Sequence, residues 1–197
     1  MSHLDALENL AFETDREGVI QCVGKYNWEA FAKENDAPEL TADKVEGLSL
    51  FDFVEGDDVK RELKRIMERV SQDPNWSWVL PFRCDAPGCK RTVVQSIRPI
   101  FSDNQCTGFS FHSFEQSSEL RPPIDLYDFK RMRKNALRED DLPVVMMCSW
   151  CQKVKAEDDT WMSAEDYYAS GNKSDVVLSH GICEECLKTT TDPFQIN

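Results

Sequence analysis

Long apolar runs are missing from this 197-residue chain, and its amino-terminal end carries no basic stretch followed by an apolar one. A helix that crosses a membrane needs about 20 largely apolar residues in succession. A secretory signal peptide needs a basic region and then an apolar core. These absences exclude both kinds of segment, so we expect a soluble protein that works in the cytoplasm.

The signature motifs of several enzyme classes are missing too. The chain contains no P-loop motif and no GxGxxG, GxSxG or HExxH. Phosphate cradling, dinucleotide binding, nucleophile-elbow hydrolysis and zinc-protease chemistry therefore lack support. A histidine-kinase phosphoacceptor and an ATP-binding segment are also absent. We expect a protein that is not an enzyme and whose output passes through a protein partner.

Positive charge is scarce. Lysine and arginine together number 23 against 36 aspartates and glutamates, which gives a formal net charge of −13. Phosphate backbones and anionic membranes attract clustered cations, so we expect neither nucleic acid nor a membrane among the partners. One basic run stands out, Lys130, Arg131, Arg133 and Lys134. A solvated helix face explains such a run, and DNA contact by a small transcription regulator is the alternative.

Apolar residues, by contrast, suffice for a packed core. Hydrophobic side chains make up 41% of the residues and aromatic ones 10%. This is ordinary for globular domains and too much for a disordered chain. The length fits one medium domain with a small appendage.

Strand and helix patterns follow one another in the first half of the chain. Residues 10–14 and 18–23 have the pattern of short strands, and the turn chemistry of Asp15–Gly18 joins them into a hairpin. A helix is expected near Asn27–Glu34. From Asp57 to Val70, apolar residues recur at three- and four-residue steps, which is the stripe of an amphipathic helix.

Three further strands are expected, over about 76–82, 92–100 and 106–114. The first alternates large apolar residues with others, which is the period of a strand with one buried face. Two strands, then helices, then three strands predict an α+β fold, with a five-stranded antiparallel sheet and helices on one face.

This order of elements resembles a bacterial PAS domain over roughly residues 5–115. The resemblance is carried by the Glu13–Gly18 hairpin, the Gly47–Val54 segment and the closing triplet of strands. Phe82–Pro87 resembles the RCDSP-like turn of one subgroup, with Ala86 where that subgroup tends to have serine. The resemblance implies a sensor that pairs as a homodimer and holds a small molecule in its pocket. The ligand stays open, because the helix over 57–70 has no histidine for haem and no Asn-Cys-Arg flavin motif is present.

Composition divides the chain further. We expect the PAS-like domain to cover 1–115 and a polar linker around one helix to cover 116–145. Pro122-Pro123 and Pro143 delimit this linker helix, since proline cannot continue a helix interior. A small four-cysteine module is expected over 146–188, and a tail over 189–197.

The module is defined by two CxxC pairs, Cys148/Cys151 and Cys183/Cys186. Each pair presents two thiolates from one tight turn, and two such turns supply a tetrahedral site for a structural Zn²⁺. A module this small has little core of its own, and a metal is the usual remedy. His180 is expected to support a ligand from outside the coordination sphere, with direct ligation as the alternative.

Other interpretations of the cysteines remain open. The four thiols of the two pairs could stay reduced without metal, or one CxxC could cycle between dithiol and disulfide in a redox sensor. Cys84 and Cys89 flank a turn, where packing thiols and a reversible disulfide are both compatible with the sequence.

The pattern from Cys148 to Cys186, with Lys153-Val154-Lys155, Trp161 and Ser179–Ile182 between the pairs, adds a second resemblance. It is similar to a zinc-ribbon-like segment found after sensor and response-regulator domains of bacterial signalling proteins. The resemblance implies a two-component setting, in which a PAS sensor is coupled to a zinc module that docks a partner.

Overall fold

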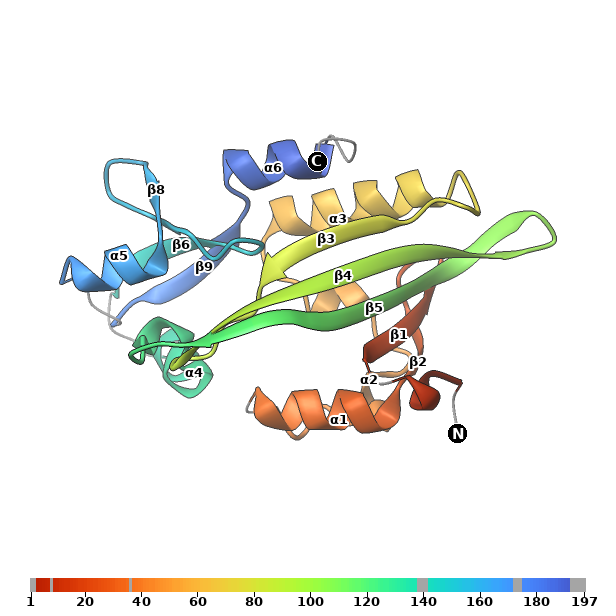
Figure 1. Ribbon diagram of the computed structural model, residues 1–197, viewed down its shortest axis with the longest axis horizontal. Helices are drawn as coiled ribbons and strands as arrows, with labels where there is room; N and C mark the ends of the chain where they lie inside the picture. Colours follow the sequence, from red (N-terminus) through yellow and green to blue (C-terminus); the bar gives the residue numbers. More distant parts are fainter. Residues whose placement is uncertain (1–2, 8, 36, 138–141, 172–174, 192–197) are drawn as a thin grey trace. The chain divides into compact units, whose positions relative to one another are not determined.

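The computed structural model of the chain describes residues 3–7, 9–35, 37–137, 142–171 and 175–191. Five of its strands form one antiparallel sheet in the order β2-β1-β5-β4-β3 (Figure 1). The strands are β1 (Leu10–Asp15), β2 (Ile20–Val23), β3 (Trp78–Arg83), β4 (Cys89–Ser102) and β5 (Gln105–Leu120). Pro81 lies in β3, an edge strand of the sheet, which is where proline is found among strands.

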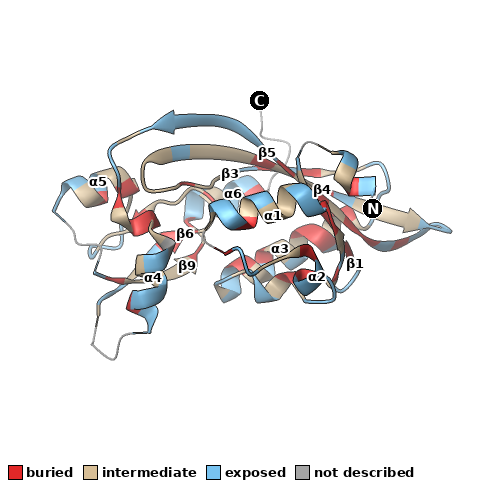
Figure 2. Ribbon diagram, turned by 90° about the horizontal axis from the view of Figure 1, so that it is seen from below, coloured by how far each residue is buried: buried red, intermediate tan, exposed pale blue. Residues whose placement is uncertain are grey.

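Helical segments fill the chain between β2 and β3. They are α1 (Lys25–Glu34), α2 (Ala42–Val45), the 3-10 turn η2 (Leu50–Asp52) and α3 (Asp57–Val70), and a further 3-10 turn, η1 (His3–Ala6), precedes β1. In α3, Val59, Ile66, Met67 and Val70 are buried, as its apolar stripe predicts, while Arg61, Lys64 and Glu68 are exposed (Figure 2). The predicted fold class, a five-stranded antiparallel sheet with helices on one face, is confirmed.

The predicted hairpin between β1 and β2 owes its turn to two residues. The carboxylate of Asp15 accepts hydrogen bonds from the backbone N–H groups of Glu17 and Val19 at 3.0 and 2.8 Å. Gly18 has φ +90°, and a Cβ there would lie 2.7 Å from the Phe51 ring. Only glycine fits this position without strain.

Strands β4 and β5 are longer than the sequence pattern predicted. Asp103 and Asn104 link them and both have positive φ, 50° and 62°. Two left-handed residues match the twist of a tight antiparallel hairpin. The strands β4 and β5 are neighbours in the sheet, and β5 continues to Leu120, past the expected domain boundary at residue 115.

The chain divides into two compact units. The first consists of Met1–Val54, Lys60–Leu80 and Val94–Phe114, and the second of Glu55–Val59, Pro81–Val93 and Glu115–Asn197. This division differs from consecutive domains over 1–115 and 146–188, because α3 and the long strands each contribute residues to both units. In the first unit, Phe12 stacks on Phe111 with ring centroids 4.6 Å apart.

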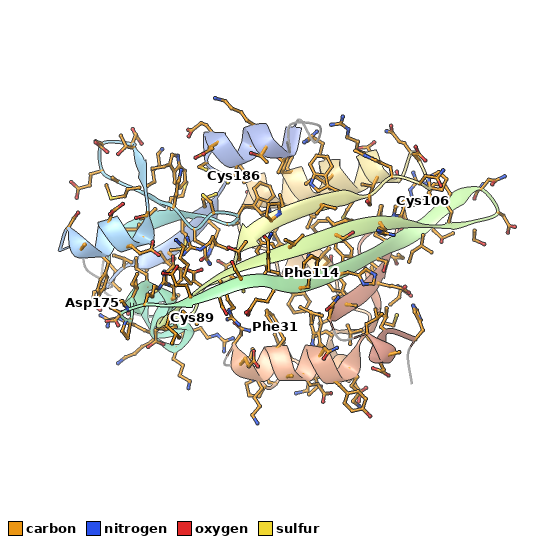
Figure 3. All side chains as sticks on the ribbon, in the orientation of Figure 1. Phe31, Cys89, Cys106, Phe114, Asp175 and Cys186 are labelled. Atoms are coloured by element: carbon orange, nitrogen blue, oxygen red, sulfur yellow. The ribbon has the colours of Figure 1, made fainter. Side chains whose placement is uncertain are left out.

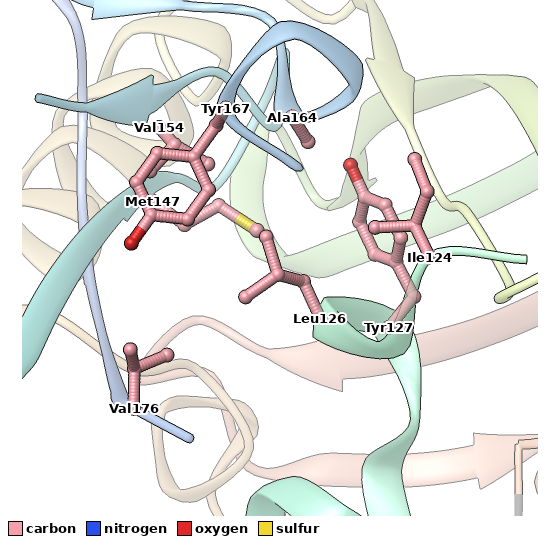
Figure 4. Close-up of a cluster of buried hydrophobic side chains, with 8 residues drawn as sticks. All are labelled: Ile124, Leu126, Tyr127, Met147, Val154, Ala164, Tyr167 and Val176. Atoms are coloured by element: carbon pink, nitrogen blue, oxygen red, sulfur yellow. The ribbon is translucent and has the colours of Figure 1, made fainter. Parts of the chain in front are cut away.

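The second unit has its own sheet and core. Strands β6 (Val144–Cys148), β7 (Val154–Lys155), β8 (Trp161–Met162) and β9 (Val177–Gly181) lie in the order β8-β7-β6-β9, and β6 and β9 run parallel. The helices α5 (Ala164–Ala169) and α6 (Glu184–Thr191) complete it. The buried cluster is made of Ile124, Leu126, Tyr127, Met147, Val154, Ala164, Tyr167 and Val176 (Figure 4).

The segment expected as a linker, 116–145, contributes to this core. Ile124, Leu126 and Tyr127 belong to the buried cluster, so the segment packs instead of spanning freely. Its expected helix appears as a 3-10 turn, η3 (Asp125–Tyr127), followed by α4 (Phe129–Ala136). Of the expected tail over 189–197, residues 192–197 lie outside the described residues. Within the described part of the chain, no helix is both long and apolar enough to cross a membrane.

Candidate metal centre

The first cysteine pair lies on the turn between β6 and β7. Cys148 is the last residue of β6, and its N–H donates to the carbonyl of Lys153 at 2.8 Å. The carbonyl of Cys148 accepts from the N–H of Gln152 at 2.9 Å, and Gln152 has φ +56°. This tight turn directs the side chains of Cys148 and Cys151 to one place.

The second pair follows β9. Parallel pairing sets Cys148 opposite Gly181, and the N–H of Ser149 donates to the Gly181 carbonyl at 2.9 Å. Cys183 comes two residues later and its carbonyl accepts from the N–H of Leu187 at 2.9 Å, in the first turn of α6. Cys186 lies within α6 (Figure 3). The β6–β9 pairing thus brings together two turns that are far apart in sequence.

All four sulfur atoms lie within 4.8 Å of one another, close enough to hold a metal ion. The Sγ atoms of Cys151 and Cys183 are 3.7 Å apart. In a tetrahedral site with Zn–S bonds of about 2.3 Å, ligand sulfurs are about 3.8 Å apart. Cys148 and Cys183 are buried, while Cys151 and Cys186 are partly exposed. The spacing of the sulfurs therefore suits a cation with tetrahedral coordination.

Charge favours a cation at this point as well. Hydrogen bonds from the Cys151 and Cys186 thiols lower the pKa of Cys148, assisted by the N–H of Cys183 3.4 Å from its sulfur. The same hydrogen bond to Cys148 raises the pKa of Cys151 to about 12, and burial adds to the rise. Four thiolates at these distances repel one another strongly. A divalent ion at their centre would replace that repulsion with attraction.

His180 takes a different direction. It lies on β9 opposite Met147, and its Nδ1 is 2.7 Å from Oε2 of Glu55, a close polar contact without the alignment of a hydrogen bond. His180 is not among the groups that lie within 4.8 Å of one another at the sulfurs. Gly56 packs against its backbone, since a Cβ there would lie 2.4 Å from the His180 carbonyl oxygen.

If His180 supports a ligand from outside the coordination sphere, His180→Ala should leave the four sulfurs in place and weaken metal binding by about tenfold to a hundredfold, the usual effect of losing such a group. Competition with a chromophoric chelator measures the affinity. Glu55→Gln is the matched variant, because it removes the carboxylate that contacts His180 and leaves the imidazole of His180 in place. Complete loss of metal in His180→Ala would instead identify His180 as a ligand.

The other sequence candidates do not join the site. Cys84 pairs with Arg91 across its hairpin through a 3.0 Å N–H to carbonyl bond, whereas Cys89 pairs with Ala86. They are therefore not cross-strand partners. Burial raises the pKa of the Cys84 thiol, which lowers its reactivity. All eight cysteines lie in described positions, and none of them forms a disulfide.

The basic run lies on α4, and its Arg131 contacts acidic residues. Arg131 Nη1 donates to Asp125 at 2.8 Å and Nη2 to Asp175 at 3.3 Å. The N-cap Asp128 accepts from the N–H of Arg131 at 3.1 Å. These contacts agree with a solvated helix face.

An open pocket beside the cysteines was not predicted. It is lined by Lys153, Trp161, Cys183, Glu184, Glu185, Lys188 and Thr189. Lys153 forms an ion pair with Glu185. The residues that line the pocket come from three separate stretches of sequence, so no local sequence pattern predicts the pocket.

No protein-family model matches the chain, and no curated protein matches it. Among solved structures it is similar to the PAS domain of BvgS from Bordetella pertussis, at 19% identity over 58% of this chain and 81% of that chain, with a TM-score of 0.44. A VqmA dimer from Vibrio cholerae is 13% identical over 57% of this chain and 48% of that chain, with a TM-score of 0.44. This chain thus spans about half the length of that protein. A sensory box sensor histidine kinase from Vibrio cholerae is 12% identical over 58% of this chain and 86% of that chain, with a TM-score of 0.40.

Proposed function

We propose that this chain is a cytoplasmic, non-catalytic signalling protein of two-component type, in which a PAS-like sensor is coupled to a zinc-stabilised module that docks a protein partner. The observation that carries the proposal is the meeting of four sulfurs, from two turns of one unit, within 4.8 Å of one another. A site with four protein ligands has no open position for a substrate, so its role is structural.

Zinc is the metal that this donor set suits best. Thiolates select soft or borderline ions, and tetrahedral S4 sites hold zinc or iron–sulfur centres. Two CxxC pairs on short turns are typical of structural zinc. Cys148 and Cys183 are buried, while Cys151 and Cys186 are partly exposed.

The sensor part of the proposal rests on the order of elements. Two strands, then helices, then three strands occur in the order on which the PAS resemblance depends. A sensor of this kind would bind a small molecule in its pocket and pair as a homodimer. Its output requires a partner, because the sequence carries no kinase segment.

The surface beside the cysteines supports a docking role for the module. The open pocket there combines the aromatic Trp161 with charges of both signs from Lys153, Lys188, Glu184 and Glu185. Mixed charge around an aromatic side chain suits recognition of a protein better than binding of a polyanion.

Native mass spectrometry of the intact chain, purified without chelator, tests the proposal because it reports metal, small ligand and oligomeric state together. We expect one zinc ion per chain and the mass of a dimer. A metal-free chain with a reversible disulfide between Cys148 and Cys151 would favour a thiol–disulfide protein instead. A monomer at tens of micromolar would remove the homodimer from the proposal.

A further inference from the structure

A buried cluster of charges lies in the second unit, apart from the four sulfurs. Asp85, whose side chain is 0% exposed, is its centre. Nε of Arg83 donates to Oδ1 at 2.8 Å, and Nη1 of Arg121 lies 2.8 Å from Oδ2. The N–H of Arg91 donates to Oδ1 at 3.0 Å. A buried carboxylate needs such partners, and Asp85 has them on both oxygens.

Arg121 extends the cluster to α5. Its side chain is 9% exposed, and Nη1 donates to Oε1 of Glu165 at 2.6 Å. Its guanidinium lies 4.5 Å from the ring centroid of Tyr127, and Nη2 donates to the carbonyl of Ala86 at 3.1 Å. Burial opposes ionisation of Glu165, yet its hydrogen bonds and the charges of the two arginines bring its pKa below the ordinary value. The positive charges of Arg83 and Arg121 thus balance the negative charges of Asp85 and Glu165.

The same residues hold the turn that presents the first cysteine pair. The N–H of Arg83 donates to the carbonyl of Trp150 at 2.6 Å. The N–H of Asp85 donates to Oε1 of Gln152 at 3.3 Å. Trp150 lies between Cys148 and Cys151, and Gln152 is the left-handed residue that closes their turn. The backbone at 83–85 therefore holds the turn of Cys148 and Cys151 in place through these two hydrogen bonds.

We propose that Asp85 is a positioning residue for the metal site: by fixing the backbone at 83–85, it holds the turn of Cys148 and Cys151 ready for the ion. This inference rests on the proposed function, since it requires a metal at the four sulfurs. A turn that is ordered before the ion arrives costs no ordering free energy on binding. By linkage, metal binding must in return stabilise the segment over 81–93.

The test compares zinc affinities of the full chain and two variants by competition with a chromophoric chelator. Asp85→Asn is expected to bind zinc at least about tenfold more weakly, in the range seen when groups outside a coordination sphere are removed. Asp159→Asn is the matched control. Asp159 pairs with Lys155 at 2.8 Å but is 85% exposed, so zinc affinity should stay within about twofold. Equal affinity of Asp85→Asn and wild type would overturn the inference.

Hydrogen exchange on the wild-type chain keeps the inference testable if Asp85→Asn fails to fold. Zinc-loaded and chelator-stripped protein are compared after the zinc stoichiometry has been measured. We expect zinc to slow exchange over 81–93 as well as over 144–155. If the chain binds one zinc ion but exchange over 81–93 is unchanged, the positioning role of Asp85 is contradicted and the proposed function is not. A chain that binds no zinc would overturn the proposed function and this inference together.

Discussion

Cys183→Ser is expected to abolish metal binding and to unfold the four-cysteine part of the chain. Cys183 is buried, its N–H donates to the sulfur of Cys148, and its own sulfur accepts from the N–H of Cys186 at 3.5 Å. Metal affinity of a small zinc unit is folding free energy, on the order of 10 kcal/mol. A serine hydroxyl is a poor substitute for a soft thiolate, so most of that free energy is lost.

Two measurements check this result. Elemental analysis should show zinc falling from about one ion per chain to near zero, as expected for a structural site that loses a ligand. Limited proteolysis should cut near Trp161 much faster. Cys89→Ser is the control, because Cys89 belongs to the same unit and its sulfur makes only a weak 3.9 Å contact to the Lys90 carbonyl among the hydrogen bonds of the described residues. Full zinc content and unchanged protease resistance in Cys183→Ser would refute the four-cysteine site.

Phe111→Ala is expected to destabilise the first unit by about 3–5 kcal/mol, the usual cost of deleting a buried phenylalanine ring. Phe111 is 1% exposed and stacks on Phe12, which is its cross-strand partner in β1. Removing the ring takes away buried apolar surface and leaves a cavity that the closely packed strands cannot fill. Urea unfolding followed by circular dichroism measures the loss.

Phe114→Ala is the matched control, since it makes the same change in the same strand. Phe114 is 44% exposed (Figure 3), and surface substitutions away from special features usually shift stability within about 0.5 kcal/mol. Equal losses in both variants would mean that Phe111 does not lie in the core that the structure shows. Zinc content should stay unchanged in Phe111→Ala under folding conditions, because neither phenylalanine contributes to the second unit.

Features that depend on neighbours in sequence were predictable. The hairpin turn at Asp15–Gly18 forms through hydrogen bonds within four residues. The cap of α5 is local as well, since the hydroxyl of Ser163 accepts from the N–H of Asp166 at 3.0 Å. The stripe of α3 follows from helical periodicity. Each CxxC spacing predicts a turn that presents two thiols.

Features that depend on distant pairing were missed. Nothing within 144–148 or 177–181 indicates that these segments become parallel neighbours, because the energy of that pairing comes from residues far apart in sequence. The Asp103-Asn104 turn, in which both residues have positive φ, is the one local signal among these features, and it favours the longer β4–β5 hairpin. The packing of Ile124, Leu126 and Tyr127 into the second core likewise needs partners from β6, β7 and α5.

The sequence by itself determined the class of the fold, the two cysteine pairs and the chemistry they favour, since residue type and short spacing set these properties. Only the tertiary structure decided that the four sulfurs meet, that His180 lies beside Glu55, and that the N–H of Asp85 donates to Gln152 in the cysteine turn. Each of these is a contact between segments separated by many residues. Such contacts depend on how whole strands pair and pack, which no local pattern records.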